Sequence, residues 1–257
     1  MNDFHTSKIL DLLSESRMTS YRTIRPNDKD ALEAYEWSLD LGQALLKPIG
    51  IVEVAVRNML DKTISAWWSE CGYPGTWIDA KDTGGKSEIL QPFVHASEWR
   101  KRAQSNKPDA DADVTHDDII AHTSLGTWRN MIGNPAAISA VAPKEFKKAQ
   151  SWHAARQQDV RCAELWKQVT SNAFPFIPET KRLRRGLSPR GYIGARLTRV
   201  SYLRNRVCHW DNLMATNISA RYDDMKELAR AIDPDLYAWL REKCSEQIEE
   251  CIASKPS

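Results

Sequence analysis

The chain has 257 residues, a formal net charge of +2 and 27% charged residues, which fits one domain with its own apolar core. No run of about 18 apolar residues occurs, and the N-terminus lacks the basic and apolar regions of a signal peptide. We therefore expect a soluble, cytoplasmic protein without a membrane span. The five cysteines show no CxxC spacing, which argues against a disulfide framework and against a zinc site.

Apolar residues at helical spacing predict helices throughout the first half of the chain. The predicted helices cover residues 6–16, 29–47, 49–69, 87–104 and 115–131. Asn27 or Asp28 is placed to cap the second helix and Thr115 the last, while Pro48 is expected to end or kink the chain between the second and third. Turn-rich residues separate the remaining helices.

The second half of the chain shows the same helical pattern. Its predicted helices cover residues 144–172, 188–210 and 233–252, and a further helix that Ser219 or Asn217 starts runs through Ala231. Ser188 and Asp233 each precede a proline and are placed to cap their helices. Because no segment alternates with the period of a strand, the predicted fold is all-α, a helical bundle with long helices and an inserted helical segment. We expect one domain over residues 1–257, with a core of about 25–70 and 155–254 and an insertion of about 71–154.

The helix predicted from Ser188 to Trp210 carries the residues that point to a function. Its apolar residues fall on one stripe of the helix and should pack against the rest of the protein: Ile193, Leu197, Val200, Leu203 and Val207. Arg204 falls within this stripe. Because a guanidinium is costly to bury without a partner, Arg204 needs a carboxylate, an anion or a wet cleft beside it.

Asn205 and His209 lie on the flank beside this stripe, four residues apart. The small residues of the same helix continue this flank: Gly191, Gly194, Thr198 and Ser201. Such a flank would admit a ligand or a second copy of the helix. The structural alternative is that Arg204 pairs with a buried carboxylate and that His209 is a hydrogen-bonded residue at the helix end.

The residues Arg204-Asn205-Arg206-Val207-Cys208-His209 resemble the signature of the HEPN superfamily of RNA-cleaving domains. Further segments in the same order resemble the Abi-like (abortive infection) proteins of bacteria: residues 34–37, 45–48, 52–58, 125–128, 165–166 and 173–175. The resemblance covers residues 25–212 and implies a HEPN-type bundle. It departs from the family pattern after the motif, where Trp210 and Asp211 stand in place of the second histidine and the acidic residue that relatives often carry.

The resemblance implies a metal-independent endoribonuclease that leaves 2′,3′-cyclic phosphate and 5′-OH ends, with no metal and no cofactor. In this hypothesis His209 acts as general base or acid, because imidazole exchanges protons near neutral pH. Arg204 binds the scissile phosphate, to which a guanidinium donates bidentate hydrogen bonds. Asn205 orients His209 or bonds the phosphate.

Three residues of the helix at 49–69 are expected to support this site: Glu53, Arg57 and Asn58. Glu53 and Arg57 stand four residues apart, so a helix-stabilising ion pair explains them equally well. In the functional alternative, Glu53 holds Arg204 or orients His209.

Positive charge gathers around the motif. Residues 161–209 contain eleven Lys or Arg and two acidic residues, a local charge of +9. The basic residues that precede and open the motif helix suit a phosphate backbone and are the predicted RNA-binding residues: Lys181, Arg182, Arg184, Arg185 and Arg190. A solvated basic loop is the alternative for this run.

The chain offers one histidine at the motif, although RNA cleavage uses both an acid and a base. The resemblance implies a homodimer in which two motifs share one cleft. It also implies a toxin of phage defence by abortive infection, with RNA as the substrate and a neutralising protein or small RNA as a partner. The alternative function is a non-catalytic RNA-binding or partner-binding helical module.

Overall fold

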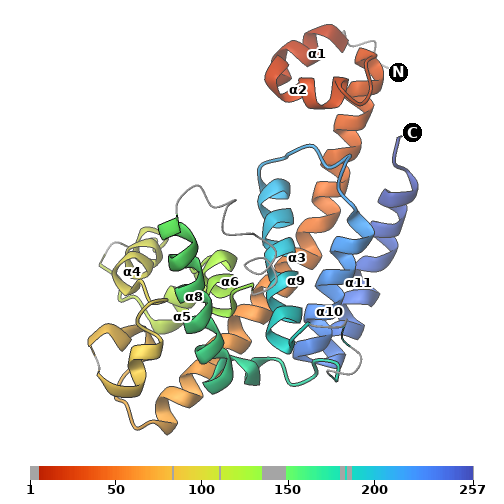
Figure 1. The fold of residues 1–257 in the computed structure, drawn as a ribbon. Coiled ribbons are helices and arrows are strands. Elements are labelled where there is room, and N and C mark those ends of the chain that lie inside the picture. The colour runs from red at the N-terminus through yellow and green to blue at the C-terminus, as the bar shows by residue number, and fades with distance from the viewer. Residues whose placement is uncertain are drawn as a thin grey trace.

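The computed structural model describes residues 6–82, 84–109, 111–134, 149–179, 183 and 187–256. In these ranges the chain is helical and contains no strand, which confirms the predicted all-α class. Figure 1 shows the elements, whose bounds are α1 (Thr6–Leu13), α2 (Glu15–Arg22), α3 (Asp28–Glu70), α4 (Ala96–Ser105), α5 (His116–Ala121), α6 (Leu125–Ile132), α8 (Ala149–Gln168), α9 (Pro189–Cys208), α10 (Ile218–Ile232) and α11 (Pro234–Ala253), with short 3₁₀ helices η1 (Trp77–Asp82), η2 (Gly85–Ile89) and η4 (Thr170–Ala173). Over these ranges, no helix is both long and apolar enough to cross a bilayer.

The long helix α3 connects the parts of the molecule. Asn27 caps it as predicted, since its side chain accepts hydrogen bonds from the backbone N–H groups of Lys29 and Asp30 at 2.8 and 3.4 Å. The expectation that Pro48 ends the helix is wrong, because α3 runs for 43 residues with Pro48 inside it. Proline removes one backbone hydrogen bond, but Leu45 and Ile49 beside it are buried in the core. Packing on both sides of the proline keeps the helix continuous.

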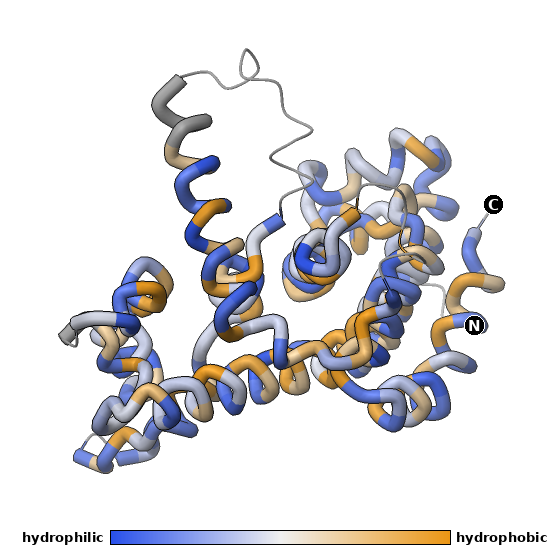
Figure 2. Tube along the Cα trace, turned by 60° about the horizontal axis from the view of Figure 1, so that its bottom comes forward, coloured by the Kyte–Doolittle hydropathy of each residue, from blue (hydrophilic) through white to orange (hydrophobic). Residues whose placement is uncertain are grey.

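Helices α9, α10 and α11 pack beside the N-terminal part of α3 and form a bundle with it (Figure 1). Figure 2 shows hydrophobic residues recurring along α3, as expected for a helix that is covered by neighbours over much of its length. Helices α1 and α2 pack at the N-terminal end of α3, and both chain ends lie near this end of the bundle. The predicted helix at residues 6–16 is interrupted at Ser14, whose φ of 70° does not continue a helix.

The elements from η1 to α8 form a second group around the C-terminal part of α3 (Figure 1). The insertion predicted at 71–154 would end inside α8, which packs on α6 and η2. The group therefore continues to Gln168. The predicted helix at 87–104 is wrong in its first half, where η2 and a turn around Pro92 precede α4. Thr115 caps α5 as predicted, and the chain breaks again before α6.

A histidine joins three elements of this second group. The His116 ring at the start of α5 contacts Asp61 Oδ1 of α3 through Nε2 at 2.9 Å and Thr76 Oγ1 through Nδ1 at 2.7 Å. Trp77 of η1 also donates to Asp61 Oδ1, at 2.7 Å. The hydrogen bond to Asp61 raises the pKa of His116 above its ordinary 6.5, burial opposes this, and the charges of Asp117 and Asp79 add to the increase.

We expect this junction to make the stability of the protein depend on pH. A histidine whose pKa is raised by folding stabilises the native state below its unfolded pKa of about 6.5, and this contribution is lost as the pH rises through the raised native value. The free energy of unfolding should therefore fall above pH 6.5. In His116→Gln, which keeps a polar side chain but does not titrate, urea unfolding at a series of pH values should lack this component. An identical pH dependence in both proteins would contradict the role of His116.

Candidate active site

Helix α9 begins and buries its apolar stripe as predicted. Ser188 accepts a hydrogen bond from the Gly191 backbone N–H at 3.1 Å, and Pro189 occupies the first helical position. All five residues of the predicted stripe are buried: Ile193, Leu197, Val200, Leu203 and Val207. This burial fixes the rotation of α9 against α3 and α10 and so decides which way the motif residues point.

Arg204 lies at the edge of the stripe, not inside it. Its side chain is 40% exposed, and its Nε lies 3.6 Å from Oε2 of Glu53, whose side chain is 18% exposed. The long arginine side chain reaches the surface while its aliphatic part follows the helix. Of the three surroundings predicted for Arg204, the structure shows a carboxylate, because the predicted contact between Glu53 and Arg204 is present.

This ion pair occupies one side of the guanidinium. No residue in the described ranges accepts a hydrogen bond from the Nη1 or Nη2 atoms of Arg204. Arg57 does not pair with Glu53 but donates through Nη1 to the Ala121 carbonyl at 2.8 Å and ties α3 to the end of α5. Asn58 is exposed on α3. Of the three predicted supporting residues, Glu53 contacts the motif through Arg204. Arg57 instead bonds the backbone of α5, and no described residue links Asn58 to the motif.

His209 lies where α9 ends. Its backbone N–H still donates to the Asn205 carbonyl at 3.0 Å, and its side chain is exposed. The next residue, Trp210, has a φ of 54°, a left-handed conformation that is uncommon for a residue with a side chain. The Trp210 N–H bonds the Val207 carbonyl at 3.1 Å and the Asp211 N–H bonds the Arg206 carbonyl at 2.9 Å. This pair of bonds is a Schellman motif, which fixes the backbone at His209.

Two arginines whose role the sequence did not indicate bond the backbone at the C-terminal end of α9. Arg17 of α2 donates to the Trp210 carbonyl at 2.6 Å. Arg206, inside the motif, donates to Thr216 Oγ1 at 3.0 Å and to the carbonyl of Asn212. A polar pocket of about 270 Å³ lies beside this turn, lined by Ser14, Ser16, Arg17, Ser20, Tyr21, Asp211 and Asn212. The Arg17 contact joins residues 193 positions apart, so no local pattern indicated it.

The small residues of α9 serve contacts inside the chain. Gly194 is buried, and a Cβ atom built on it would lie 1.9 Å from the Gly133 carbonyl oxygen after α6. Ser201 is buried as well, and Thr198 accepts a hydrogen bond from Asn134 at 3.3 Å. The expectation that this whole flank admits a second helix is wrong, because the end of α6 occupies the part around Gly194. Asn205 and His209 remain exposed beyond it.

The predicted basic surface is described only in part. Lys181, Arg182, Arg184 and Arg185 lie outside the described residues. Arg190 is 8% exposed, its Nη1 lies 2.8 Å from Asp159 Oδ1, and it donates to the Ile132 carbonyl at 3.1 Å. This buried arginine joins α9 to α8 and α6, so its predicted contact with an RNA backbone does not fit its position.

The motif residues thus gather on one exposed end of α9. Arg204 presents two donor groups, Asn205 and His209 point to solvent on the neighbouring face, and Glu53 lies behind Arg204. Comparisons with protein-family models, with curated proteins and with solved structures found no match to this chain. The resemblance to Abi-like and HEPN proteins therefore stays a hypothesis that rests on the motif residues, and the function is argued from their geometry.

Proposed function

We propose that this protein is a metal-independent endoribonuclease of the HEPN type, with Arg204, Asn205 and His209 as its active residues. The observation that carries the proposal is the exposure of an arginine, whose Nη donors bond no described residue, together with an imidazole at the same helix end. Asn205 and His209 are four residues apart, and side chains at this spacing on a helix are neighbours. Arg204 and His209 are five residues apart, or about 140° around the helix. In this proposal the long Arg204 side chain and the turn of the chain at His209 let one RNA segment reach all three groups.

The reaction assigns a task to each group. His209 takes the proton from a ribose 2′-OH, and the oxygen attacks the adjacent phosphorus while the bond to the 5′-oxygen breaks. The free Nη groups of Arg204 donate to the phosphate oxygens as negative charge builds up on them. In this proposal Glu53, which lies 3.6 Å from Nε, orients the guanidinium for this contact. An acid protonates the departing 5′-oxygen, which leaves a 2′,3′-cyclic phosphate and a 5′-OH end.

The acid comes from a second copy of the chain in this proposal. One His209 supplies the base and the His209 of the partner supplies the acid across a two-fold axis. Two large apolar side chains beside the motif support a contact there, because Tyr202 is 62% exposed and Trp210 is 40% exposed. A homodimer that covers them would bring two motifs to one cleft.

The basic test is to incubate purified protein with labelled RNA in EDTA and to analyse the ends of the products. We expect cleavage without added metal, with cyclic phosphate termini.

Arg204→Ala should reduce the rate of RNA cleavage roughly 100-fold, since it removes donors aimed at the charge of the transition state. Arg102→Ala, which removes an exposed arginine of α4 paired with Glu98, is the matched control and should cut at the rate of the parent protein. Intact RNA in EDTA, bound in a salt-sensitive manner, would favour the non-catalytic RNA-binding module instead.

The dimer is tested through the exposed apolar residues. Each chain has a mass of 29.3 kDa, and light scattering should report twice this value in solution. Tyr202→Glu places a charge in the proposed contact and should yield a monomer that cuts RNA poorly. Trp239→Glu, at a 49% exposed position of α11, is the control and should leave both mass and cleavage unchanged. A parent protein that is monomeric and still cuts RNA at full rate would contradict an active site shared by two chains.

A cytoplasmic nuclease of this kind must be restrained in the growing cell. We propose that it acts as a toxin of abortive infection and that a neutralising protein or small RNA holds it inactive. Growth arrest on expression of the parent chain, relieved by His209→Ala, would support this role. Sequencing the 5′-OH ends from such cells identifies the RNA target.

A further inference from the structure

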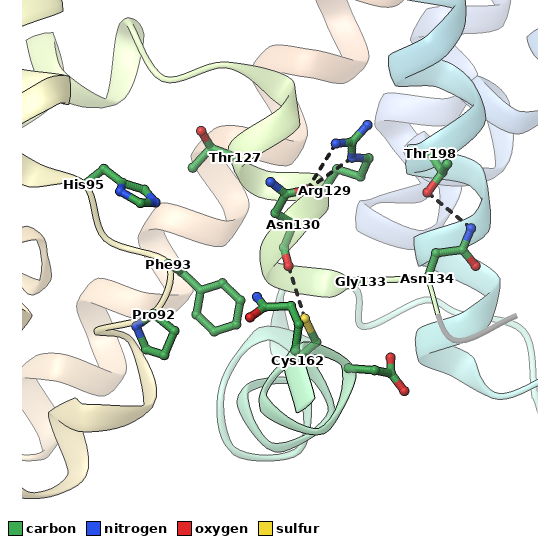
Figure 3. A pocket seen from close by; sticks show the side chains of 12 residues that line it. Pro92, Phe93, His95, Thr127, Arg129, Asn130, Gly133, Asn134, Cys162 and Thr198 are labelled. Atoms are coloured by element: carbon green, nitrogen blue, oxygen red, sulfur yellow. Dashed lines mark hydrogen bonds between the residues drawn. The ribbon is translucent and has the colours of Figure 1, made fainter. Parts of the chain in front are cut away.

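A pocket of about 450 Å³ lies where the second group of helices meets α9 (Figure 3). It is distinct from the motif, and three elements build most of it: the turn before α4, helix α6 with the two residues after it, and helix α8. Its lining residues are Pro92, Phe93, His95, Thr127, Arg129, Asn130, Gly133, Asn134, Gln158, Asp159, Cys162 and Thr198. This volume is in the range of pockets that hold small organic ligands, which is about 300–1,000 Å³.

Part of the pocket lining is apolar. Phe93 and Pro92 lie side by side there, and Cys162 of α8 faces them (Figure 3). The Cys162 thiol donates to the Asn130 carbonyl at 3.1 Å, and burial raises its pKa to about 11. The thiol is therefore neutral and contributes apolar surface and not a nucleophile.

The lining also carries groups that both donate and accept hydrogen bonds. Asn130, Asn134 and Gln158 each bring a side-chain amide to the lining. Such amides match the edges of nucleobases, which alternate donors and acceptors.

The pocket lining also carries the positive charge of Arg129. Arg129 donates to the Asn130 side-chain oxygen at 3.1 Å, and no carboxylate in the described ranges forms an ion pair with it. The acid that lines the pocket, Asp159, is paired with Arg190 at 2.8 Å. Arg129 is therefore placed to attract an anionic group such as a phosphate.

We propose that this pocket binds one nucleotide, with its base against Phe93 and the amides and its phosphate at Arg129. The nucleotide belongs either to an RNA strand or to a free ligand. If the nucleotide belongs to an RNA strand, the pocket binds the substrate of the proposed nuclease, and this part of the inference rests on that proposed function. Thr198 at the pocket and Asn205 of the motif lie on one face of α9, seven residues or about 10 Å apart along the axis. A strand held in the pocket would thus run toward the motif and select the cleavage position.

Binding is measured by calorimetry with the four nucleoside monophosphates and with a fully 2′-O-methylated oligonucleotide, which has no 2′-OH to attack. We expect Arg129→Gln to weaken binding roughly 10-fold, as for loss of a charged hydrogen bond. Asn130→Ala should weaken it and change the preference among bases. Arg102→Gln, in the same group of helices, is the control, and thermal unfolding checks that each variant is folded.

This experiment distinguishes an RNA strand from a free nucleotide as the ligand. It also tests the nucleotide pocket separately from the nuclease. Tighter binding of the oligonucleotide than of every monophosphate identifies a strand, and the reverse identifies a free nucleotide. Absence of binding by both probes, or equal affinity in the parent protein and in folded Arg129→Gln and Asn130→Ala, overturns the nucleotide pocket even if RNA is cleaved. Binding that depends on Arg129, in a protein that leaves RNA intact in EDTA, supports the pocket and contradicts the nuclease.

Discussion

His209→Ala is expected to lose about 100-fold or more of the RNA-cleaving rate, which is the scale of one acid or base group. The loss should appear in the rate of the bound complex and not in RNA affinity, because in the proposed reaction the imidazole moves a proton while Arg204 holds the phosphate. The fold should be unaffected. The His209 side chain is exposed, and no residue in the described ranges bonds its ring, so its removal should change the free energy of unfolding by less than about 0.5 kcal/mol.

The matched control is Cys208→Ser, which changes the exposed neighbouring residue of the same helix end and should cut RNA normally. Single-turnover cleavage with saturating protein separates the chemical step from binding. If a folded His209→Ala protein cuts RNA as fast as the parent, the imidazole has no part in the reaction and the nuclease proposal fails.

Gly194→Ala should destabilise the protein by about 3 kcal/mol, the upper part of the usual range for overpacking. The added Cβ would lie 1.9 Å from the Gly133 carbonyl oxygen, which is backbone and not the end of a flexible side chain. Gly133 itself has a φ of 71°, a conformation that brings its carbonyl against α9 and that a residue with a side chain adopts with strain. Either α9 or the end of α6 must move.

The same substitution at Gly50 provides the control. Gly50 lies inside α3, is exposed, and has no atom within 4 Å of a Cβ built on it. Gly50→Ala should therefore stabilise the protein by about 0.5–1 kcal/mol. Thermal unfolding of the two variants should then show a lowered midpoint for one and a raised midpoint for the other. Equal stability of Gly194→Ala and the parent would contradict the packing of α6 on α9.

The sequence by itself determined what depends on neighbouring residues. The caps at Asn27, Thr115, Ser188 and Asp233 are present as predicted, because a capping side chain bonds backbone groups two or three residues away. The buried stripe of α9 was predicted equally well, since the period of a helix fixes which residues share a face. The all-α class follows from the same local pattern.

Only the tertiary structure decided which contacts the predicted faces make. Pro48 remains inside a helix because its neighbours are buried on both sides, and Arg190 is buried because Asp159 of another helix neutralises it. Gly194 is small because the end of α6 lies against it. Arg204 reaches the surface and meets Glu53, which the sequence left as one of two alternatives. In each case the deciding partner is distant in sequence or on another helix, and a local pattern specifies a face but not the residue that packs against it.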